Sequence, residues 1–399
     1  MKILYLAPRF PYYPLKGDQL RDYNQIKLLS KKHEITLVTF QAADTKEEDI
    51  KYMQQYCRLE LVFWNKIQSH LNVLRGSLSR LPLQVGYFAS PAMSAKIKHL
   101  LKHNHYDLIH VHLARMAEYV KDHQGIPKVI DLMDAFSLNM RNRAKREKLL
   151  FKVVSKVEEL RMKNYEKTLC QKFDKVIVVS ERDRAALGIQ ENVSILPLGV
   201  DLRKPKKNKK YRHDLIFTGN MGYFPNQDAV LWFTKEVFPL ILKKMPHLTF
   251  AIVGNNPGQK IKKLASKHIK VTGFVPSIYD YLAQARLAVA PLRSGSGMQI
   301  KVLEAMAAGC PVVATHYVSE GIAHASERKE IFIAPDDAQQ FADKVVQVLQ
   351  NNNLCQQVAK TALNLIEKEY TWNRVVSRLD RIYTESAGND LLKTDSSKE

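Results

Sequence analysis

The sequence predicts an α/β protein built from two doubly wound parallel sheets. Short apolar runs that suit strands covered on both faces alternate with segments of helical periodicity along most of the chain. The length of 399 residues is enough for two domains of roughly 150–200 residues each. A hydrophobic content of 45% with 25% charged residues is typical of a soluble globular chain. No apolar run approaches the ~18 residues that a membrane span needs.

The first domain is expected over residues 1–200. Apolar runs predict its strands at residues 3–6, 35–40, 108–111, 129–132 and 176–179. A strongly basic polar segment follows at 201–213 and is expected to link the two domains. The second domain is then expected over 214–368. Further along, 369–387 has the spacing of a helix, and 388–399 is mostly polar and charged and is expected to be disordered.

One segment of the second half, from Leu287 to Thr315, carries the strongest chemical signal. It consists of a buried strand, a glycine-rich turn, a helix with Lys301 and Glu304, and a second buried strand. Glycines let the backbone approach a ligand, and a helix N-terminus offers unpaired N–H groups to an anion. Lys301 and Glu304 share one helix face, where a cation suits phosphate and a carboxylate suits paired hydroxyls. A surface Lys–Glu pair without a ligand fits the spacing equally well.

This segment resembles the donor-site signature of the retaining glycosyltransferases of family 4. The resemblance implies the GT-B fold, in which two Rossmann-like domains face each other across a cleft. Most members carry two glutamates with seven residues between them, the first for the transferred sugar and the second for the nucleotide ribose. Glu304 matches the second, whereas Ser296 stands where the first is expected. The Gly-x-Gly variant before Lys301 is similar to bacterial members that build exported polysaccharides, in which the lysine meets the diphosphate.

Other residues of the second domain become donor-binding candidates through the same resemblance. They lie in loops that follow predicted strands, at the sheet edge where α/β proteins bind ligands. Arg293 and Lys301 are expected to replace the diphosphate-binding arginine and lysine that many relatives carry in the loop after residue 218, and Phe274 and Val275 are expected to line the base pocket. The full set of donor-binding candidates is Gly17, Gly219, Asn220, Gly254, Phe274, Val275, Arg293, Ser296, Gly297, Met298, Gln299, Lys301, Glu304 and Glu320.

In the first domain, the loop after the first strand contains Gly17, Asp18 and Arg21. It lies at the carboxyl end of that strand, so these residues are candidates for contacts with donor phosphates or acceptor, with a surface loop and an Asp18 helix cap as the alternative. His110 and His112 alternate along a strand end and therefore share one face. Without an evident third ligand we expect them to contact substrate on the acceptor side, not a metal.

The catalytic helper is harder to assign. Relatives often have a histidine shortly after the strand that ends here near Asp131, and this sequence has Met133 and Asp134 instead. Asp131 and Asp134 are the two carboxylates placed to substitute, with helix capping as the alternative for Asp134. The candidate catalytic set is therefore Asp131, Asp134, Lys301 and Glu304.

No metal or other cofactor is expected. The sequence has no Asp-x-Asp pair to hold a divalent ion on a diphosphate, and its four cysteines form no metal-ligand spacing. Lys301, Arg293 and the helix N-terminus after Gly297 would then neutralise the leaving group. A nucleotide diphosphate sugar is expected as the co-substrate.

The net charge of +21 is unusual and is spread over both halves of the chain. Such a surface favours polyanions or anionic lipid headgroups, and no nucleic-acid recognition motif accompanies it. Leu71, Leu74, Leu78 and Leu81 form an apolar stripe beside basic residues, which is either core-facing or a membrane contact. We expect an enzyme in the cytoplasm, peripheral to the inner face of the cell membrane, with a lipid-linked or polysaccharide acceptor.

The resemblance thus predicts a metal-independent, hexosyltransferase-type enzyme for cell-surface polysaccharide or glycolipid synthesis. It would move a sugar to an acceptor hydroxyl with retention of configuration. Two other functions stay open: a nucleotide-sugar epimerase or hydrolase of the same fold, and an inactive polyanion-binding protein, for which the missing first glutamate is an argument.

Overall fold

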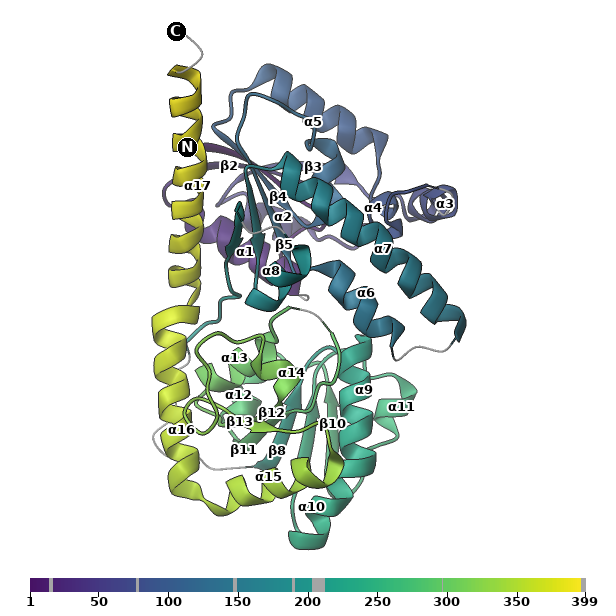
Figure 1. Ribbon diagram of the computed structural model, residues 1–399, viewed down its shortest axis with the longest axis vertical. Coiled ribbons are helices and arrows are strands. Elements are labelled where there is room, and N and C mark those ends of the chain that lie inside the picture. Colours follow the sequence, from purple (N-terminus) through teal and green to yellow (C-terminus); the bar gives the residue numbers. More distant parts are fainter. Residues whose placement is uncertain are drawn as a thin grey trace. The chain divides into compact units, whose positions relative to one another are not determined.

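The computed structural model describes residues 1–13, 17–76, 79–145, 149–188, 191–202, 212–295 and 297–395. The side chains of residues 66, 74–76, 149–150 and 389–395 are outside this description. The chain divides into two compact units, one of residues 1–198 with 375–399 and the other of residues 199–374. Each unit contains one parallel sheet between helices (Figure 1).

The first unit has a seven-stranded sheet in which all neighbouring strands run parallel. In sheet order its strands are β3 (Arg58–Phe63), β2 (Glu34–Gln41), β1 (Lys2–Ala7), β4 (Leu108–His112), β5 (Lys128–Met133), β6 (Lys175–Val178) and β7 (Val193–Ile195). Its helices are α1 (Gly17–Leu29), α2 (Glu47–Met53), α3 (Lys66–Gly76), α4 (Leu83–Tyr87), α5 (Pro91–His103), η1 (Ala114–Tyr119), α6 (Phe136–Ala144), α7 (Leu149–Lys172), α8 (Glu181–Leu187) and α17 (Trp372–Asp395).

Two cores cover the two faces of this sheet because side chains alternate along each strand. From β1, Leu4 and Leu6 join the core shared with α5 and α7, whereas Ile3 and Tyr5 join the core shared with α1 and α17. Figure 1 shows α17, in yellow, along the side of the sheet opposite α5 and α7. The C-terminal helix therefore completes the first unit, although it is the last element of the chain.

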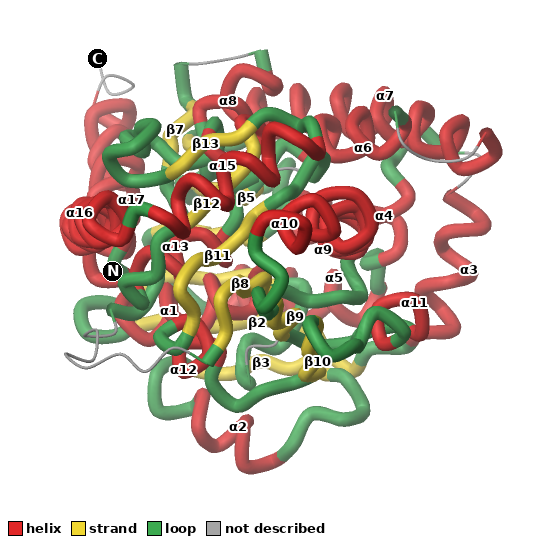
Figure 2. Tube along the Cα trace, turned by 90° about the horizontal axis from the view of Figure 1, so that it is seen from below, coloured by secondary structure: helices red, strands yellow, loops and turns green. Residues whose placement is uncertain are grey.

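The second unit has a six-stranded parallel sheet, which Figure 2 shows in yellow among red helices. Its strands in sheet order are β10 (Ile269–Gly273), β9 (Phe250–Val253), β8 (His213–Thr218), β11 (Ala285–Ala290), β12 (Val312–Thr315) and β13 (Phe332–Ala334). Its helical elements are α9 (Phe224–Trp232), η2 (Phe233–Val237), α10 (Phe238–Lys244), α11 (Gln259–Lys262), α12 (Ile278–Leu282), α13 (Ile300–Ala307), α14 (His316–Ser319), α15 (Ala338–Gln350), α16 (Asn352–Leu365) and η3 (Ile366–Tyr370). The two sheets confirm the predicted pair of Rossmann-like domains.

The chain passes between the units at Leu198–Gly199 and again at Arg374–Val375. A Cβ added at Gly199 would lie 2.4 Å from the Trp372 ring, so glycine is required where the first passage packs on the start of α17. Most of the predicted linker, residues 203–211, lies outside the described residues. The prediction for the tail is wrong in part, because α17 continues to Asp395 and does not give way to disorder at 388.

Candidate active site

Glycine-containing turns follow β8, β9 and β11 at their carboxyl ends. Gly219 follows β8 and Gly254 follows β9, and both have positive φ angles, +154° and +143°. A Cβ added at Gly254 would lie 1.9 Å from the Gly219 carbonyl oxygen, so the two turns touch. Gly297 (φ +64°) precedes α13, and a Cβ on Gly321 would come within 3.1 Å of its carbonyl oxygen. Glycine at these positions leaves backbone, not side chain, facing the end of the sheet.

Lys301 lies on the first turn of α13, beside these glycines. Its Nζ donates to Gln299 Oε1 at 2.8 Å and lies 5.7 Å from the centroid of the Phe217 ring. A Cβ added at Gly219 would lie 3.2 Å from Lys301 Cε, so the glycine makes room for the lysine. Neither Gln299 nor Phe217 carries a charge, so the ammonium group of Lys301 can still neutralise an anion.

Glu304 lies one turn further along the same helix, and it does not form an ion pair with Lys301 within the described part of the chain. Burial raises the pKa of Glu304 to about 8, with a partial offset from Lys301 and a further upward contribution from Asp201. Burial also lowers the pKa of Lys301 to about 8, against the influence of Glu304. Burial that lowers the pKa of a base and raises the pKa of an adjacent acid is common in binding sites.

The remaining donor candidates fall into two groups around α13. Gln299 is the N-cap residue of α13, and Met298 and Gln299 are buried beside Gly297. Asn220 follows Gly219 directly, and exposed Glu320 precedes Gly321 at the end of α14. Phe274 and Val275 follow β10, which two strands separate from β11. Of the Phe274 surface 60% is exposed, so this ring is not packed into the core. Ser296 lies outside the described residues.

Arg293, which we predicted to hold the diphosphate, is paired within the second unit, and its contact with a diphosphate stays a prediction. Its Nη2 lies 3.1 Å from both carboxylate oxygens of Asp228, and its guanidinium group stacks 4.8 Å from the Trp232 ring centroid. Asp336 adds a weaker contact at 3.8 Å. Arg293 thus joins α9 to the loop after β11, and a diphosphate would have to compete with two carboxylates for it.

The structure corrects the roles predicted for Asp131 and Arg21. Both side chains are fully buried, and Arg21 Nε donates to Asp131 Oδ2 at 2.6 Å. Arg21 also donates to the carbonyl oxygens of Leu196 and Pro197, at 3.1 and 3.0 Å. Although burial opposes ionisation, Arg21 and the neighbouring histidines hold the pKa of Asp131 below its usual value. The ion pair therefore has a structural role near the end of the first unit. Asp131 is not a catalytic carboxylate, and Arg21 is not an acceptor contact.

His110 and His112 belong to the same buried network, so their predicted contact with acceptor is also wrong. His110 stacks on Tyr5 with ring centroids 4.2 Å apart, and its Nδ1 lies 2.8 Å from the Tyr383 hydroxyl. Burial lowers the pKa of His110 to about 3. His112 Nδ1 lies 2.6 Å from Asp22 Oδ1, and this carboxylate raises the His112 pKa despite burial.

Three predicted residues of the first unit stay near its surface. Asp18 lies in the first turn of α1 and pairs with Arg9. Gly17 is exposed, with nothing within 4 Å of an added Cβ. Asp134 is half-buried, but the N-cap of α6 is Ala135, so the alternative capping role of Asp134 is not seen. Buried Glu166 instead accepts the hydrogen bond from Ser137 N at this helix start.

Sequence reasoning missed two contributors to the donor-side geometry. Asn226 Nδ2 donates to the Asn220 carbonyl oxygen at 2.8 Å and holds the turn after β8. The sequence does not predict that the Asn226 side chain lies beside Gly219. Asp201 was part of a predicted linker, yet it acts on Glu304 electrostatically. Neither contact follows from local spacing, because both depend on how separate loops meet.

Among the residues that the structure describes, no three His, Cys, Asp or Glu side chains form a group that could hold a metal ion. Within the same residues, no helix is long and apolar enough to cross a membrane.

Comparison with known proteins agrees with this geometry. Residues 23–204 match the family model described as Glycosyltransferase Family 4, and residues 212–351 match the one described as Glycosyl transferases group 1. The fold is also similar to that of sucrose-phosphate synthase from Thermosynechococcus elongatus, with a TM-score of 0.72 over 96% of this chain and 98% of that one at 14% identity.

Two relatives extend the comparison. An uncharacterised 44.6 kDa protein from the cps region of Klebsiella pneumoniae is 22% identical over 95% of this chain and 98% of its own length. The UDP-Gal:alpha-D-GlcNAc-diphosphoundecaprenol alpha-1,3-galactosyltransferase of Escherichia coli is 24% identical over 71% of this chain and 76% of its own. With both units matched in order, the chain belongs to the glycosyltransferases of the GT-B fold, with a family 4 first unit and a group 1 second unit.

Proposed function

We propose that this glycosyltransferase transfers a hexose from a UDP-sugar to a hydroxyl of a lipid-linked saccharide during the synthesis of a surface polysaccharide, with retention of configuration and without a metal ion. The observation that carries the proposal is the pair Lys301 and Glu304 on α13, beside turns in which Gly219, Gly254 and Gly297 expose backbone. The E. coli relative acts on a UDP-sugar and a diphosphate-linked acceptor, as its name states, and supports this choice of substrates.

The two α13 side chains suit opposite halves of one nucleotide. Lys301 and the N-terminus of α13 would meet the diphosphate, where negative charge develops as the sugar departs. Glu304 would accept hydrogen bonds from the ribose hydroxyls. Exposed Phe274, with Val275, would cover the base. Leaving-group stabilisation by Lys301 is a chemical role that needs no divalent ion.

Asp131 cannot serve as a nucleophile on the sugar, because it is buried and paired with Arg21. Asp134 is the candidate carboxylate of the first unit that keeps some exposure. We therefore place the main catalytic contribution on the departing diphosphate, and we assign Asp134 at most a contact with the transferred sugar.

Product analysis tests this function. The protein is incubated with UDP-glucose or UDP-galactose, with and without a synthetic N-acetylglucosamine diphosphate lipid, and products are resolved by mass spectrometry. We expect UDP release and a disaccharide lipid only when acceptor is present. Acceptor-independent release of UDP and free sugar would identify a hydrolase, and interconversion of the two donors an epimerase.

We also propose reversible binding to anionic membranes through the start of α3, at the cytoplasmic face. Of the predicted stripe, Leu71 is 48% exposed, as is its neighbour Ile67 at 74%, whereas Leu81 at the other end packs against the core. Leu78 lies outside the described residues, and the Leu74 side chain is not described. The net charge of +21 also favours an anionic surface. Each basic residue near such a surface would add about 1 kcal/mol of binding free energy.

Vesicle sedimentation tests the membrane proposal. The protein should sediment with vesicles that contain phosphatidylglycerol, be released as salt rises, and ignore pure phosphatidylcholine. Ile67→Ser with Leu71→Ser should weaken sedimentation and leave UDP affinity unchanged. The absence of binding to anionic vesicles at low salt would contradict the proposal.

A further inference from the structure

The loop that follows β5, residues 133–137, carries Asp134 and has a constrained backbone. Met133 has a φ angle of +61°, in the left-handed region that residues with a side chain seldom adopt. Its carbonyl oxygen accepts from Val179 N at 2.7 Å, and Asp134 N donates to the Leu132 carbonyl oxygen at 2.9 Å. Such a conformation costs free energy and persists only where surrounding contacts impose it. Other elements must therefore hold this loop.

Three buried carboxyl groups hold it. The loop N–H groups at positions 133, 135 and 137 donate to Asp131 Oδ1, Asp183 Oδ1 and Glu166 Oε1, at 3.0, 3.2 and 3.1 Å. Each acid comes from a different element, β5, α8 and α7, and none is more than 2% exposed. Alternate N–H groups of the loop are thus fixed, and Asp134 lies between the fixed positions.

The three acids differ in how their surroundings balance a negative charge. Asp131 pairs with Arg21, and Asp183 accepts from a serine hydroxyl. Glu166 Oε2 is buried without a hydrogen-bond partner, and no cation pairs with this carboxyl group in the described part of the chain. Glu166 also supplies the side-chain acceptor for the start of α6, because the N-cap residue Ala135 has none.

Glu166 changes its charge near neutral pH. Burial raises the pKa of Glu166 to about 7, the charge of Asp134 acts in the same direction, and hydrogen bonds from Ser137 oppose both. One turn further along α7, burial raises the pKa of the Cys170 thiol to about 11, so this neighbour stays protonated. From α8, Asp183 holds the same loop two residues away. A carboxylate accepts a stronger hydrogen bond than a carboxylic acid and suits the positive end of a helix, so ionised Glu166 holds α6 more firmly.

We propose that Glu166 is a positioning residue: it holds the first turn of α6 and thereby fixes the loop that places Asp134 against the transferred sugar. The proposal rests on the glycosyltransferase function proposed above, in which Asp134 contacts that sugar. Helices α6, α7 and α8 pack against one another, so a shift at the start of α6 moves the loop (Figure 1). A misplaced contact still lets the donor bind but slows transfer, and the loss therefore falls on kcat.

The pH dependence of kcat tests the proposal. UDP-glucose or UDP-galactose is supplied at saturation with the N-acetylglucosamine diphosphate lipid, for wild type and for Glu166→Gln, whose amide oxygen can accept from Ser137 N but cannot ionise. The ratio of wild-type kcat to variant kcat should be below about two at pH 6 and rise to about five at pH 8, because wild-type Glu166 ionises between them. Groups at the donor site titrate equally in both proteins, so their effect cancels in this ratio.

Two further variants complete the test. Glu166→Ala removes the acceptor and should lower kcat roughly 10-fold at both pH values, with a donor KM within about two-fold of wild type. Glu159→Gln is the control, because Glu159 lies on the same helix but pairs with Arg141 near the surface, and its kcat ratio should stay near one at both pH values.

A ratio of wild-type kcat to Glu166→Gln kcat that is the same at pH 6 and pH 8 would overturn the proposal, and so would a loss confined to the donor KM. Circular dichroism shows whether each variant is folded, and if Glu166→Ala does not fold, the ratio for Glu166→Gln decides alone. Absence of transfer by the wild type contradicts the proposed function instead.

Discussion

The carboxyl edges of the two sheets have the same topology but opposite chemical character. At the edge of the first sheet, Arg21, His110, His112 and Asp131 are completely buried and bonded to one another or to nearby groups. At the edge of the second sheet, Lys301 and Glu304 are only half-buried and lie beside glycine turns. Position at a strand end is therefore not enough to identify a ligand contact. Burial and the charge of the neighbouring partners distinguish a structural network from a site.

The largest effect should come from breaking the buried network. Arg21→Met leaves the Asp131 carboxylate buried without its partner, at a cost of roughly 3–5 kcal/mol in the free energy of unfolding. Chemical denaturation measures it. Lys32→Met is the control, because Lys32 is exposed and its pair with Asp380 should contribute less than about 1 kcal/mol. Equal losses for both variants would show that the buried pair has no special weight.

The next effect concerns catalysis at the second edge. Lys301→Ala removes a charge-assisted contact with the departing diphosphate and should lower kcat/KM by an amount equivalent to about 2–4 kcal/mol. Its unfolding free energy should change little, since Lys301 bonds only to Gln299 in the described part of the chain. Steady-state assays at subsaturating donor measure this. Unchanged kcat/KM would return Lys301 to the role of a surface lysine.

The sequence predicts the site residues at the carboxyl edge of the second sheet better than those at the edge of the first, for a physical reason. Lys301, Glu304 and their glycines belong to one continuous segment, so spacing alone brings them together. The burial of His110 instead depends on Tyr383, which comes from the last helix of the chain. Arg293 likewise contacts Asp228 only through tertiary packing, which no local sequence pattern predicts.

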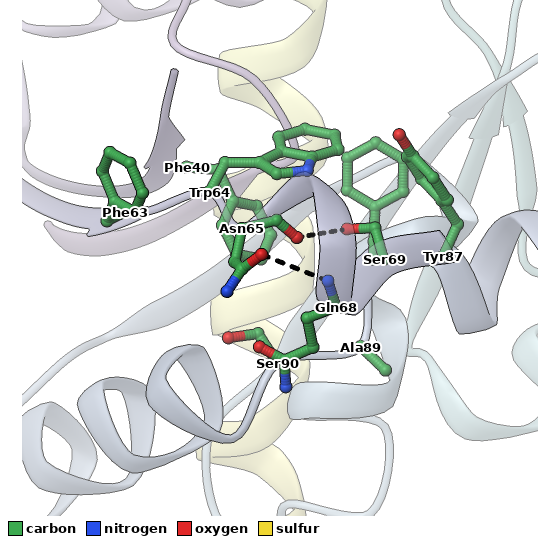
Figure 3. A pocket seen from close by; sticks show the side chains of 10 residues that line it. Phe40, Phe63, Trp64, Asn65, Gln68, Ser69, Tyr87, Ala89 and Ser90 are labelled. Atoms are coloured by element: carbon green, nitrogen blue, oxygen red, sulfur yellow. Dashed lines mark hydrogen bonds between the residues drawn. The ribbon is translucent and has the colours of Figure 1, made fainter. Parts of the chain in front are cut away.

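The same limit applies to the fold. Continuous apolar runs predict the central strands, because these are buried on both faces. The edge strand β3 was missed because its sequence RLELVF alternates charged and apolar residues, and β13 because it is only three residues long. A small aromatic pocket lined by Phe63, Trp64 and Phe88 begins at the end of this missed strand (Figure 3), so its residues could not be grouped in advance.

A smaller effect should follow from filling the space beside Lys301. A Cβ at Gly219 would approach Asn226 Nδ2 to 2.9 Å and Lys301 Cε to 3.2 Å, at a φ angle that side chains disfavour. Gly219→Ala should therefore weaken UDP binding by roughly 1–3 kcal/mol, measured by calorimetry. Gly258→Ala is matched to it, because nothing lies within 4 Å of its added Cβ, and it should bind UDP like wild type. Identical affinities of the two variants would remove Gly219 from the site.

The smallest expected effect is a dependence of UDP affinity on pH. With pKa values of about 8, Lys301 loses its proton and Glu304 gains a negative charge as pH rises through that value. Both changes disfavour a diphosphate, so UDP affinity should fall several-fold between pH 7 and 9. Uridine, which lacks the diphosphate, should not show this fall. A parallel decrease for uridine and UDP would point to another titrating group.

The central claim is that one face of α13 holds both halves of the nucleotide, and calorimetric titration of Glu304→Gln with UDP, UMP and 2′-deoxy-UDP tests it most directly. At pH 9, where Glu304 is ionised, replacing one of its two carboxylate oxygens by an amide NH₂ group should reduce the preference for UDP over 2′-deoxy-UDP by about 1–3 kcal/mol. The preference for UDP over UMP, which reports the Lys301 contact, should stay at its wild-type value. A full ribose preference in Glu304→Gln, or a loss of both preferences together, would contradict the account.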